Sequence, residues 1–280
     1  MNRLARIVQR VSQEPPFRVV TKSLVKIFST SMRTWEWWDI SPRPQYLTGV
    51  LAAADEALEE GVKEISVYEF GVAGGNGLLA LSNIAAAVEI ETGIRIAVYG
   101  FDTGAGLPEL TGDYRDYPDH WQPGDYPMNE AALRKRLPRR TTLVLGNVRD
   151  TIPEYLPGIR EPIGFIALDV DIYSSSRDVL RMFADPKRRM LRRVYMYCDD
   201  VDLRFTHRFA GELLAIEEFN CSGAGVKIDQ WRGLAKLRPF PDAGWLGRMF
   251  IAHDIEAISK VRRAEKPRVI GVDDETGATG

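Results

Sequence analysis

Between residues 62 and 255, short apolar runs alternate with stretches of helical periodicity, and this alternation limits the possible folds of the chain. The runs with the length of buried strands are 65–70, 94–101, 142–145, 163–168 and 194–198. Helix-like stretches, notably 78–90 and 175–183, separate most of them. Near-continuous apolar strands joined by helical crossovers predict an α/β fold with a doubly wound, mostly parallel, Rossmann-like sheet covered on both faces.

The end of the predicted sheet has a different pattern. Residues 226–237 and 248–253 are joined by the turn-rich segment 239–244, which predicts an antiparallel closing hairpin. We expect residues 61–260 to form one α/β domain, preceded by an N-terminal helical lid at residues 1–60. Residues 261–280 are polar and glycine-rich, so we expect a disordered tail.

The N-terminal segment is helical in pattern and basic. Residues 1–34 carry seven Lys/Arg against the single acid Glu14, which we interpret as the solvated face of a lid rather than a membrane-surface helix. Ser41 followed by Pro42 predicts the start of another helix. The three tryptophans at 35, 37 and 38 either line a substrate pocket or anchor the lid. The sequence leaves open whether the lid covers its own subunit or a neighbouring copy in a homo-oligomer.

Composition excludes several classes of protein. A net charge of −2 and a pI near 6.0 give no general attraction to nucleic acid or anionic membranes. The basic run 187–193 lacks interleaved aromatic residues and favours a solvated surface turn over a nucleic-acid contact. There is no apolar run long enough to span a membrane, and residues 1–16 do not have the pattern of a secretory signal. Only two cysteines are present, which fits a reducing cytoplasm.

A glycine-rich turn follows the first predicted strand. Glu69 and Phe70 end the strand, and Gly71, Gly74, Gly75 and Gly77 precede the next helix. In a doubly wound sheet such a turn lies at the edge where ligands bind, and its glycines let a ligand approach the backbone closely. The pattern of nicotinamide-binding proteins would place glycine at 73 and 76, where Ala73 and Asn76 stand. Glu69 at the strand tip is placed to hold a cationic amine or sulfonium.

The second predicted strand ends in an acid, Asp102, followed by Thr103. A carboxylate at this position is placed to accept hydrogen bonds from both ribose hydroxyls of an adenosine. A solvated loop aspartate is the alternative, and the glycine turn upstream favours ribose binding. The segment 113–128, rich in aromatic residues and proline, follows at the same edge, and we interpret it as a substrate-facing loop.

Several motifs together resemble the macrocin O-methyltransferase family, whose members modify sugar hydroxyls on natural products. They lie at residues 100–108, 146–153, 168–176, 199–200 and 211–219. The resemblance implies a class I methyltransferase fold, S-adenosylmethionine as methyl donor and a divalent metal such as Mg²⁺. The donor-binding residues it implies, together with those argued above, are Glu69, Gly71, Gly75, Gly77, Asp102, Thr103, Asn147, Val148 and Asp169.

Two pairs of carboxylates follow neighbouring predicted strands: Asp169 and Asp171, then Asp199 and Asp200. Crowded carboxylates resist ionisation unless a cation compensates them, and oxygen ligands favour Mg²⁺ over Ca²⁺ or zinc. Alternatively, one of the four caps the next helix. By the resemblance, Asp169, Asp199 and Asp200 are metal ligands and Asp171 is the general base.

His207 is a second candidate for the catalytic base. The sequence departs from the family after the second pair, where residues 201–203 read Val-Asp-Leu and contain no aromatic residue.

These features predict an S-adenosylmethionine-dependent, Mg²⁺-dependent methyltransferase acting on a hydroxyl of a small molecule, such as a sugar of a glycosylated natural product. Two alternatives stay open. The first is another acceptor, namely a carboxylate, an amine or a catechol. The second is a non-catalytic subunit that binds S-adenosylmethionine, although a pure binding module has no need of the acidic residues at 169–171 and 199–200.

Overall fold

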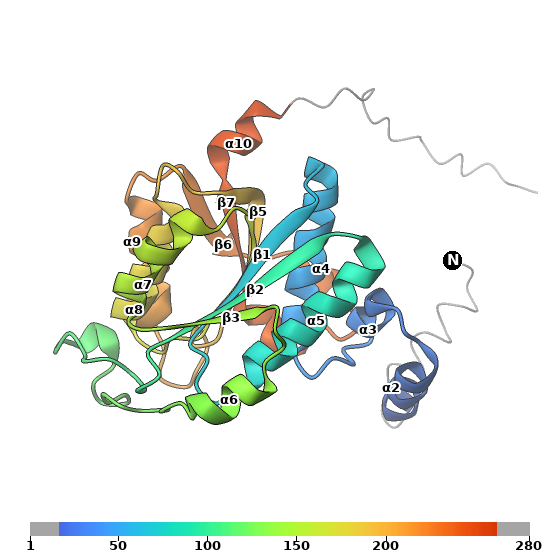
Figure 1. The fold of residues 1–280 in the computed structure, drawn as a ribbon, viewed down its shortest axis with the longest axis horizontal. Coiled ribbons are helices and arrows are strands. Elements are labelled where there is room, and N and C mark those ends of the chain that lie inside the picture. Colours follow the sequence, from blue (N-terminus) through green and yellow to red (C-terminus); the bar gives the residue numbers. More distant parts are fainter. Residues whose placement is uncertain (1–16, 262–280) are drawn as a thin grey trace, which may run out of the picture.

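The computed structural model describes residues 17–261 of the chain, and seven strands of this part form one sheet (Figure 1). The strands are β1 (Glu64–Phe70), β2 (Arg95–Asp102), β3 (Thr141–Leu145), β4 (Ile163–Leu168), β5 (Met190–Cys198), β6 (Val226–Gln230) and β7 (Met249–Asp254). Their order is β3-β2-β1-β4-β5-β7-β6. The order reverses between β1 and β4, so the edge beyond their carboxyl ends is a topological switch point.

The first five strands are parallel, and β7 runs antiparallel to both β5 and β6. This confirms the predicted fold class, a doubly wound, mostly parallel α/β sheet that ends in an antiparallel hairpin. The first strand of the hairpin is shorter than predicted, since β6 ends at Gln230 and not at residue 237. Gly233 interrupts the apolar run, and Leu234–Leu237 form a short 3₁₀ helix instead.

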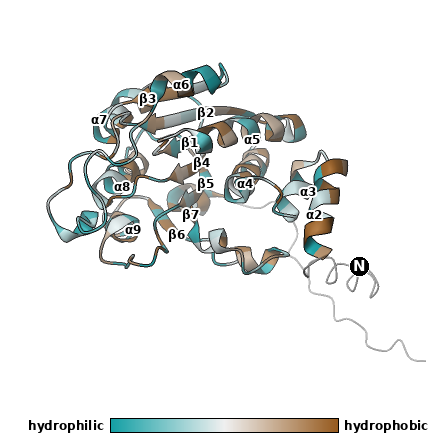
Figure 2. Cartoon of the chain, turned by 90° about the horizontal axis from the view of Figure 1, so that it is seen from below, coloured by the Kyte–Doolittle hydropathy of each residue, from teal (hydrophilic) through white to brown (hydrophobic). Residues whose placement is uncertain are grey.

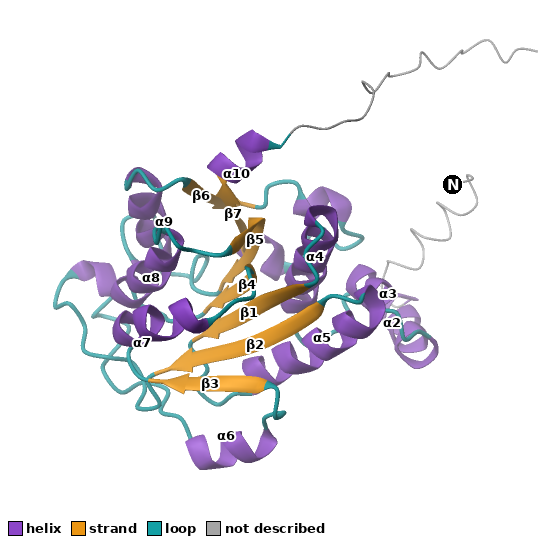
Figure 3. Cartoon of the chain, turned by 45° about the horizontal axis from the view of Figure 1, so that its top comes forward, coloured by secondary structure: helices purple, strands orange, loops and turns teal. Residues whose placement is uncertain are grey.

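Helices cover both faces of the sheet (Figure 3). They are α2 (Phe17–Phe28), α3 (Met32–Trp37), α4 (Pro44–Glu60), α5 (Asn76–Thr92), α6 (Glu130–Arg136), α7 (Val148–Tyr155), α8 (Tyr173–Leu180), α9 (Gly211–Cys221) and α10 (Ile255–Lys260). Residues of α4 and α5 share one apolar core with the sheet, and residues of α7, α8 and α9 share a second. Each face is therefore buried, which explains why the strands read as continuous apolar runs.

Helix α4 begins later than the sequence predicted. Its first residue is Pro44 and its N-cap is Arg43, whereas we expected Ser41 and Pro42 in these roles. A residue that precedes proline is disfavoured in the helical region, and Arg43 accordingly has φ −127° and ψ 76°. Most of α4 is buried against the sheet, so this part of the predicted lid belongs to the core.

The two helices before α4 lie together on one side of the molecule (Figure 2). Trp35 packs against the core, and the ring of Trp38 lies 6.0 Å from that of Phe240. Trp35 and Trp38 therefore anchor this segment, whereas Trp37 is exposed, and none of the three lines the cavity described below. Within the described residues, no helix has the length and apolarity needed to cross a membrane. The predictions for residues 1–16 and for the tail at 262–280 fall outside the described residues.

Candidate functional site

A cavity of about 890 Å³ opens at the carboxyl ends of the parallel strands. Its walls come from the turns after β1, β3, β4 and β5, from the long connection between β2 and α6, and from Arg43 before α4. All the predicted site residues except His207 line it: Glu69, Gly71, Gly75, Gly77, Asp102, Thr103, Asn147, Val148, Asp169, Asp171, Asp199 and Asp200. Topology brings them together, because parallel strands end at one edge of the sheet.

The turn at residues 71–77 is here called the glycine loop. Its conformation depends on a close contact between the backbone of Gly71 and the backbone of Asp169. Gly71 has φ +85°, and a Cβ atom added to it would lie 1.6 Å from the carbonyl oxygen of Asp169. Its N–H donates to the Phe101 carbonyl, and the N–H of Asp169 donates to the Phe70 carbonyl, both at 2.9 Å. Only glycine fits at position 71. The contact places the glycine loop directly beside Asp169, the first acid after β4.

Glu69 is buried, with an exposed fraction of 2%, and points along the start of α5. A Cβ atom at Gly77 would lie 1.8 Å from its Oε1, so the glycine makes room for this carboxylate. Tyr46 donates its hydroxyl to Oε1 at 2.7 Å, and within the described residues Oε2 has no hydrogen-bond partner. Burial raises the pKa of Glu69 to about 8, although the hydrogen bond from Tyr46 acts in the opposite direction.

This pKa predicts how stability depends on pH. The Glu69 carboxyl has a reference pKa of 4.5 and a folded-state pKa of about 8, so the folded protein binds the proton more tightly. Its contribution to stability is greatest below the lower value and is lost as the pH rises through the upper one. We expect the free energy of unfolding of the parent, relative to Glu69→Gln, to fall by more than about 1 kcal/mol between about pH 5 and about pH 8. Urea unfolding at both pH values measures this, and an unchanged difference would contradict it.

Asp102 does more than the sequence indicated, because it also holds the glycine loop. Its Oδ2 accepts the backbone N–H groups of Val72 and Ala73, each at 2.8 Å. Its Oδ1 accepts the N–H of Gly104 at 2.6 Å. A carboxylate has about four lone-pair positions, and three are used, so Asp102 can accept about one further hydrogen bond from a ligand in the cavity.

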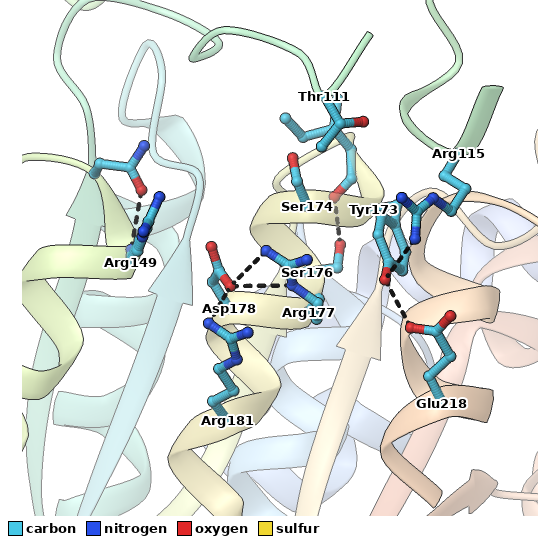
Figure 4. Close-up of polar contacts among 12 residues, drawn as sticks. Thr111, Arg115, Arg149, Tyr173, Ser174, Ser176, Arg177, Asp178, Arg181 and Glu218 are labelled. Atoms are coloured by element: carbon cyan, nitrogen blue, oxygen red, sulfur yellow. Dashed lines mark hydrogen bonds and ion pairs between the residues drawn. The ribbon is translucent and has the colours of Figure 1, made fainter. Parts of the chain in front are cut away.

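The predicted adenine side of the cavity lies at the start of α7. Asn147 is the N-cap of this helix, and its Oδ1 accepts the backbone N–H of Arg149 at 2.9 Å. Figure 4 shows this contact at Arg149. Val148 is buried and Thr103 is half-buried, with its hydroxyl donating to the Gly106 carbonyl. Asn147 and Thr103 therefore have structural roles of their own at the places where we predicted donor contacts.

The carboxylate cluster, defined as Asp169, Asp171, Asp199 and Asp200, lies beside the glycine loop. Burial, followed by repulsion from Asp199, raises the pKa of Asp169 to about 8. Burial and the neighbouring Asp171 raise the pKa of Asp200 to about 8, and burial and Asp169 raise that of Asp171 to about 7. Burial is the larger cause of these shifts, and the negative charge of the neighbouring carboxylates adds to it.

Two arginines supply the compensation for this negative charge. Arg43 acts on Asp169, and Arg248 contacts Asp199 at 3.2 Å and Asp202 at 2.5 Å. Tyr197 also donates its hydroxyl to Asp199. Asp200 keeps one buried oxygen, Oδ2, without a partner among the described residues. Within residues 17–261, however, no three His, Cys, Asp or Glu side chains converge into a ready-made metal site. The oxygen donors and the partnerless Asp200 oxygen fit a cation that keeps several of its water ligands, as Mg²⁺ does.

Sequence reasoning missed a fifth acid behind the cluster. Glu212, at the start of α9, has an exposed fraction of 1% and accepts the backbone N–H of Asp200 at 3.2 Å. Burial and the charge of Asp200 raise its pKa well above the usual value. Glu212 supports the turn that carries Asp199 and Asp200. In the sequence, only its position within the motif at 211–219 distinguished Glu212 from other acidic residues.

Asp171 occupies a strained turn. It has φ +62°, which is uncommon for a residue with a side chain, and the N–H of Ile172 bonds back to the Val170 carbonyl at 2.6 Å. Helix α8 starts two residues later, where the N–H of Ser174 donates to the carboxylate of the fully buried Asp116 at 2.8 Å. The surrounding structure thus holds Asp171 in a conformation that directs it into the cavity.

The connection between β2 and α6, residues 103–129, is called the aromatic loop, and polar contacts fix it to α8 and α9. Thr111 donates its hydroxyl and its N–H to Asp116, which reaches α8 as described above. Tyr173 accepts from Arg115 at 3.3 Å and donates to Glu218 of α9 at 2.6 Å (Figure 4). The predicted substrate-facing loop is therefore anchored at its base.

Beyond this base the loop forms one side of the cavity. His120, Trp121 and Tyr126 line the cavity together with Phe205, which follows β5, and these four residues are called the aromatic wall. The rings of His120 and Phe205 are 3.8 Å apart, and those of Trp121 and Tyr126 are 6.1 Å apart. His207 is exposed and does not line the cavity; its backbone contacts Tyr117 instead.

Residues 17–42, the described part of the predicted lid that precedes Arg43, do not line the cavity. Arg43 is the first described residue that does. Helix α3 contacts the far end of α5, where Glu91 accepts from Ser31 and from the N–H of Met32. The role of the N-terminal segment as a lid, and its contact with a neighbouring copy, stay predictions.

Comparison with known proteins gives little beyond the fold. No known protein family matches the chain. No curated protein matches it either. Among solved structures, it is similar to the calicheamicin methyltransferase CalS11, with 22% identity, a TM-score of 0.44, and 73% of this chain and 84% of that chain covered.

It is also similar to the protein CmcI, with 16% identity, a TM-score of 0.40, and 76% and 71% of the two chains covered. An O-methyltransferase from Bacillus cereus is 14% identical at a TM-score of 0.40, with 88% and 96% covered. The resemblance to macrocin O-methyltransferases in particular stays a prediction. The function of the chain is therefore argued from the residues of its own cavity.

Proposed function

We propose that this chain transfers the methyl group of S-adenosylmethionine to a hydroxyl of a small molecule, with the help of a divalent cation such as Mg²⁺. One observation carries the proposal: the glycine loop with its two acids, Glu69 and Asp102, opens into the same cavity as the carboxylate cluster. The first group suits a cationic nucleoside, and the second suits the activation of a hydroxyl. Adjacent placement is what a transfer between two bound molecules requires.

For the donor, Asp102 accepts a hydrogen bond from a ribose hydroxyl, and Asn147 and Val148 contact the adenine. The glycine loop, with Gly71, Gly75 and Gly77, passes close to the ribose and the methionine part. Glu69 faces the positive charge of the donor, and its partnerless Oε2 supports this role. Thr103 and Asp169 provide the remaining contacts with the donor. These assignments follow from the lining of the cavity and from the resemblance stated above.

For the reaction, the acceptor oxygen attacks the methyl carbon from the side opposite the sulfur. The new C–O bond forms as the C–S bond breaks, and the bonding pair passes to sulfur, leaving S-adenosylhomocysteine. Asp171, held by its strained turn, takes the hydroxyl proton. A bound Mg²⁺, held by Asp169, Asp199 and Asp200, would make that hydroxyl more acidic. His207 lies outside the cavity lining, so Asp171 is the better placed of the two candidate bases.

For the acceptor, the aromatic wall indicates a molecule with a flat or hydrocarbon ring face. Sugars and polyketide-like rings both pack their C–H groups against aromatic side chains, and a hydroxyl on such a ring would reach the carboxylate cluster. We propose a sugar or related ring of a small natural product as the acceptor. Leu203, which stands within the segment that departs from the family, also lines this part of the cavity.

Titration calorimetry with S-adenosylhomocysteine and NAD⁺ side by side, with and without Mg²⁺, tests the donor. We expect binding of S-adenosylhomocysteine and no binding of NAD⁺. Binding of NAD⁺ alone would overturn the assignment. Transfer of a labelled methyl group to members of a panel of hydroxylated sugars and ring compounds then separates an enzyme from a non-catalytic binding subunit.

The metal can be tested without knowing the acceptor. We expect Mg²⁺ to raise the melting temperature of the protein, since a cation at 100 times its dissociation constant stabilises by about 2.7 kcal/mol. Asp200→Asn should reduce this gain several-fold. Asp242→Asn is the matched control, because Asp242 is exposed and does not line the cavity. Equal gains in both variants, or full methyl transfer after exhaustive chelation, would count against the metal.

A further inference from the structure

Helix α2 presents large apolar side chains to solvent. Five of them recur at helical spacing and share one side of the helix, here called the outer face. They are Phe17, Val20, Leu24, Ile27 and Phe28. Their exposed fractions run from 50% for Leu24 to 81% for Phe28, and no residue of the helix is buried. An amphipathic helix of a folded chain normally buries such a side, so the outer face needs an explanation.

The basic side of α2 is the one turned toward its own chain. The guanidinium carbon of Arg18 lies 3.8 Å from the centroid of the Phe240 ring. The Nζ atom of Lys22 lies 4.6 Å from the same centroid and donates to the Asp39 carbonyl at 3.1 Å. Arg18 and Lys22 are half-buried, and Figure 2 shows α2 at the outer edge of the molecule. The contacts that hold α2 in place therefore leave its apolar side uncovered.

The size of the outer face fits a protein interface. Five aromatic and aliphatic side chains exposed to this degree leave roughly 600–700 Å² in water. The largest apolar patch of a typical monomer measures about 300–600 Å². Each partner of a stable interface contributes about 800 Å². The outer face alone supplies most of that area.

The charges of α2 indicate which partner covers the outer face. The face contains no charged residue, so a second copy of it meets neither repulsion nor an unpaired charge, and a two-fold axis brings the same patch together from both partners. A helix on an anionic membrane uses its basic residues to reach the lipid headgroups. Here Arg18 and Lys22 contact Phe240 and Asp39 instead, and of the basic residues of α2 only Lys26 is exposed.

We propose that the outer faces of two copies of this chain pack against each other across a two-fold axis and make the protein a dimer. Helix α2 is then an element of assembly. The interface lies away from the cavity, because no described residue before Arg43 lines it. The inference is independent of the proposed function.

The mass of the full chain in solution tests the dimer. Sedimentation equilibrium at about 1–100 μM protein should give the mass of two chains. Leu24→Asp and Ile27→Asp each place a carboxylate in the apolar interface, and each should raise the dissociation constant of the dimer about 100-fold or more. Both side chains are exposed in the single chain, so circular dichroism should show unchanged helix content.

Leu58→Asp is the matched control. Leu58 lies on α4 and has an exposed fraction of 51%, against 50% for Leu24, so the same change is made at an equally exposed leucine. We expect this variant to keep the mass of two chains. Dissociation by Leu58→Asp as well would show that the effect is not specific to the outer face and would overturn the inference.

Cross-linking tests whether the two outer faces touch. Leu24→Cys, near the middle of the outer face, is made together with Cys221→Ser, because Cys221 is exposed. A two-fold axis brings position 24 close to its own copy, so mild oxidation should give a disulfide-linked dimer, whereas Leu58→Cys in the same background should not.

Two outcomes of the mass measurements would overturn the proposal. One is the mass of a single chain at every concentration, which would result if a lipid surface or residues 1–16 of the same chain covered the outer face. The other is a dimer that Leu24→Asp and Ile27→Asp leave intact.

Discussion

Gly71→Ala should abolish detectable binding of S-adenosylhomocysteine and lower the stability of the fold. The new methyl group would lie 1.6 Å from the Asp169 carbonyl oxygen, and the residue would keep a φ of +85° that alanine disfavours. The contacting atom belongs to the main chain, so the conflict is relieved only by separating the ends of β1 and β4. We expect a loss of about 2–4 kcal/mol, combining backbone strain with overpacking. Thermal unfolding and calorimetry measure the two effects.

Gly74→Ala is the matched control within the same loop. A Cβ atom at Gly74 meets nothing within 4 Å, and this glycine does not have a positive φ. We expect its stability to stay within about 0.5 kcal/mol of the parent. If both alanine variants lose the same stability, the close contact between Gly71 and the Asp169 backbone does not determine the conformation of the glycine loop. The geometry assigned to Gly71 would then be wrong.

Two replacements of Asp102 should differ in how much stability and donor affinity they lose. Asp102→Ala removes the acceptor of three backbone N–H groups, so we expect lower stability, by about 1–3 kcal/mol, and no measurable donor binding. Asp102→Asn keeps one oxygen, enough for the N–H groups of Val72 and Ala73, which both bond to Oδ2. Its amide NH₂ would face the N–H of Gly104, which loses its acceptor. We expect a smaller loss of stability than in Asp102→Ala, and binding of adenosine-containing ligands about 10- to 100-fold weaker than in the parent.

The ligand for this pair is 5′-methylthioadenosine, because it contains the ribose but lacks the amino acid end. Its affinity therefore measures the ribose contact without any contribution from the amino acid end of the donor. Parent-like affinity in Asp102→Asn would mean that Asp102 only holds the glycine loop, and the ribose would then need another partner.

The sheet and its binding edge were predictable because they depend on local patterns. Apolar runs matched the first five strands within a few residues, and the order of the acids along the chain placed them at one edge once the strands were known to be parallel. The glycine at 71 was recognisable as part of the turn between a strand and a helix, but its close neighbour is the main chain of Asp169 and not the ligand that we expected there.

The contacts that the sequence missed join residues distant in the chain. Tyr46 reaches Glu69 from another element, Asp116 reaches Ser174, and Arg248 reaches Asp199. No spacing rule connects such pairs, because their approach is set by the packing of helices on the sheet. The predicted helix start at Ser41 failed for a local reason instead: two prolines offered two starts, and the second one placed Arg43 at the cavity.

The aromatic wall has a consequence for how this protein could diversify. Its side chains come from the aromatic loop and from the turn after β5, whereas the glycine loop is tied by main-chain contact to the sheet itself. Asp116 anchors the middle of the aromatic loop to α8, and Trp121 is buried in one cluster with Ile172, the N-cap of α8. The exposed Tyr126 is the wall residue that can be exchanged without disturbing these contacts. Replacing this residue would alter which ring is accepted and leave the donor chemistry intact. Under the proposed function, variation in this loop would therefore change the range of acceptors separately from the donor.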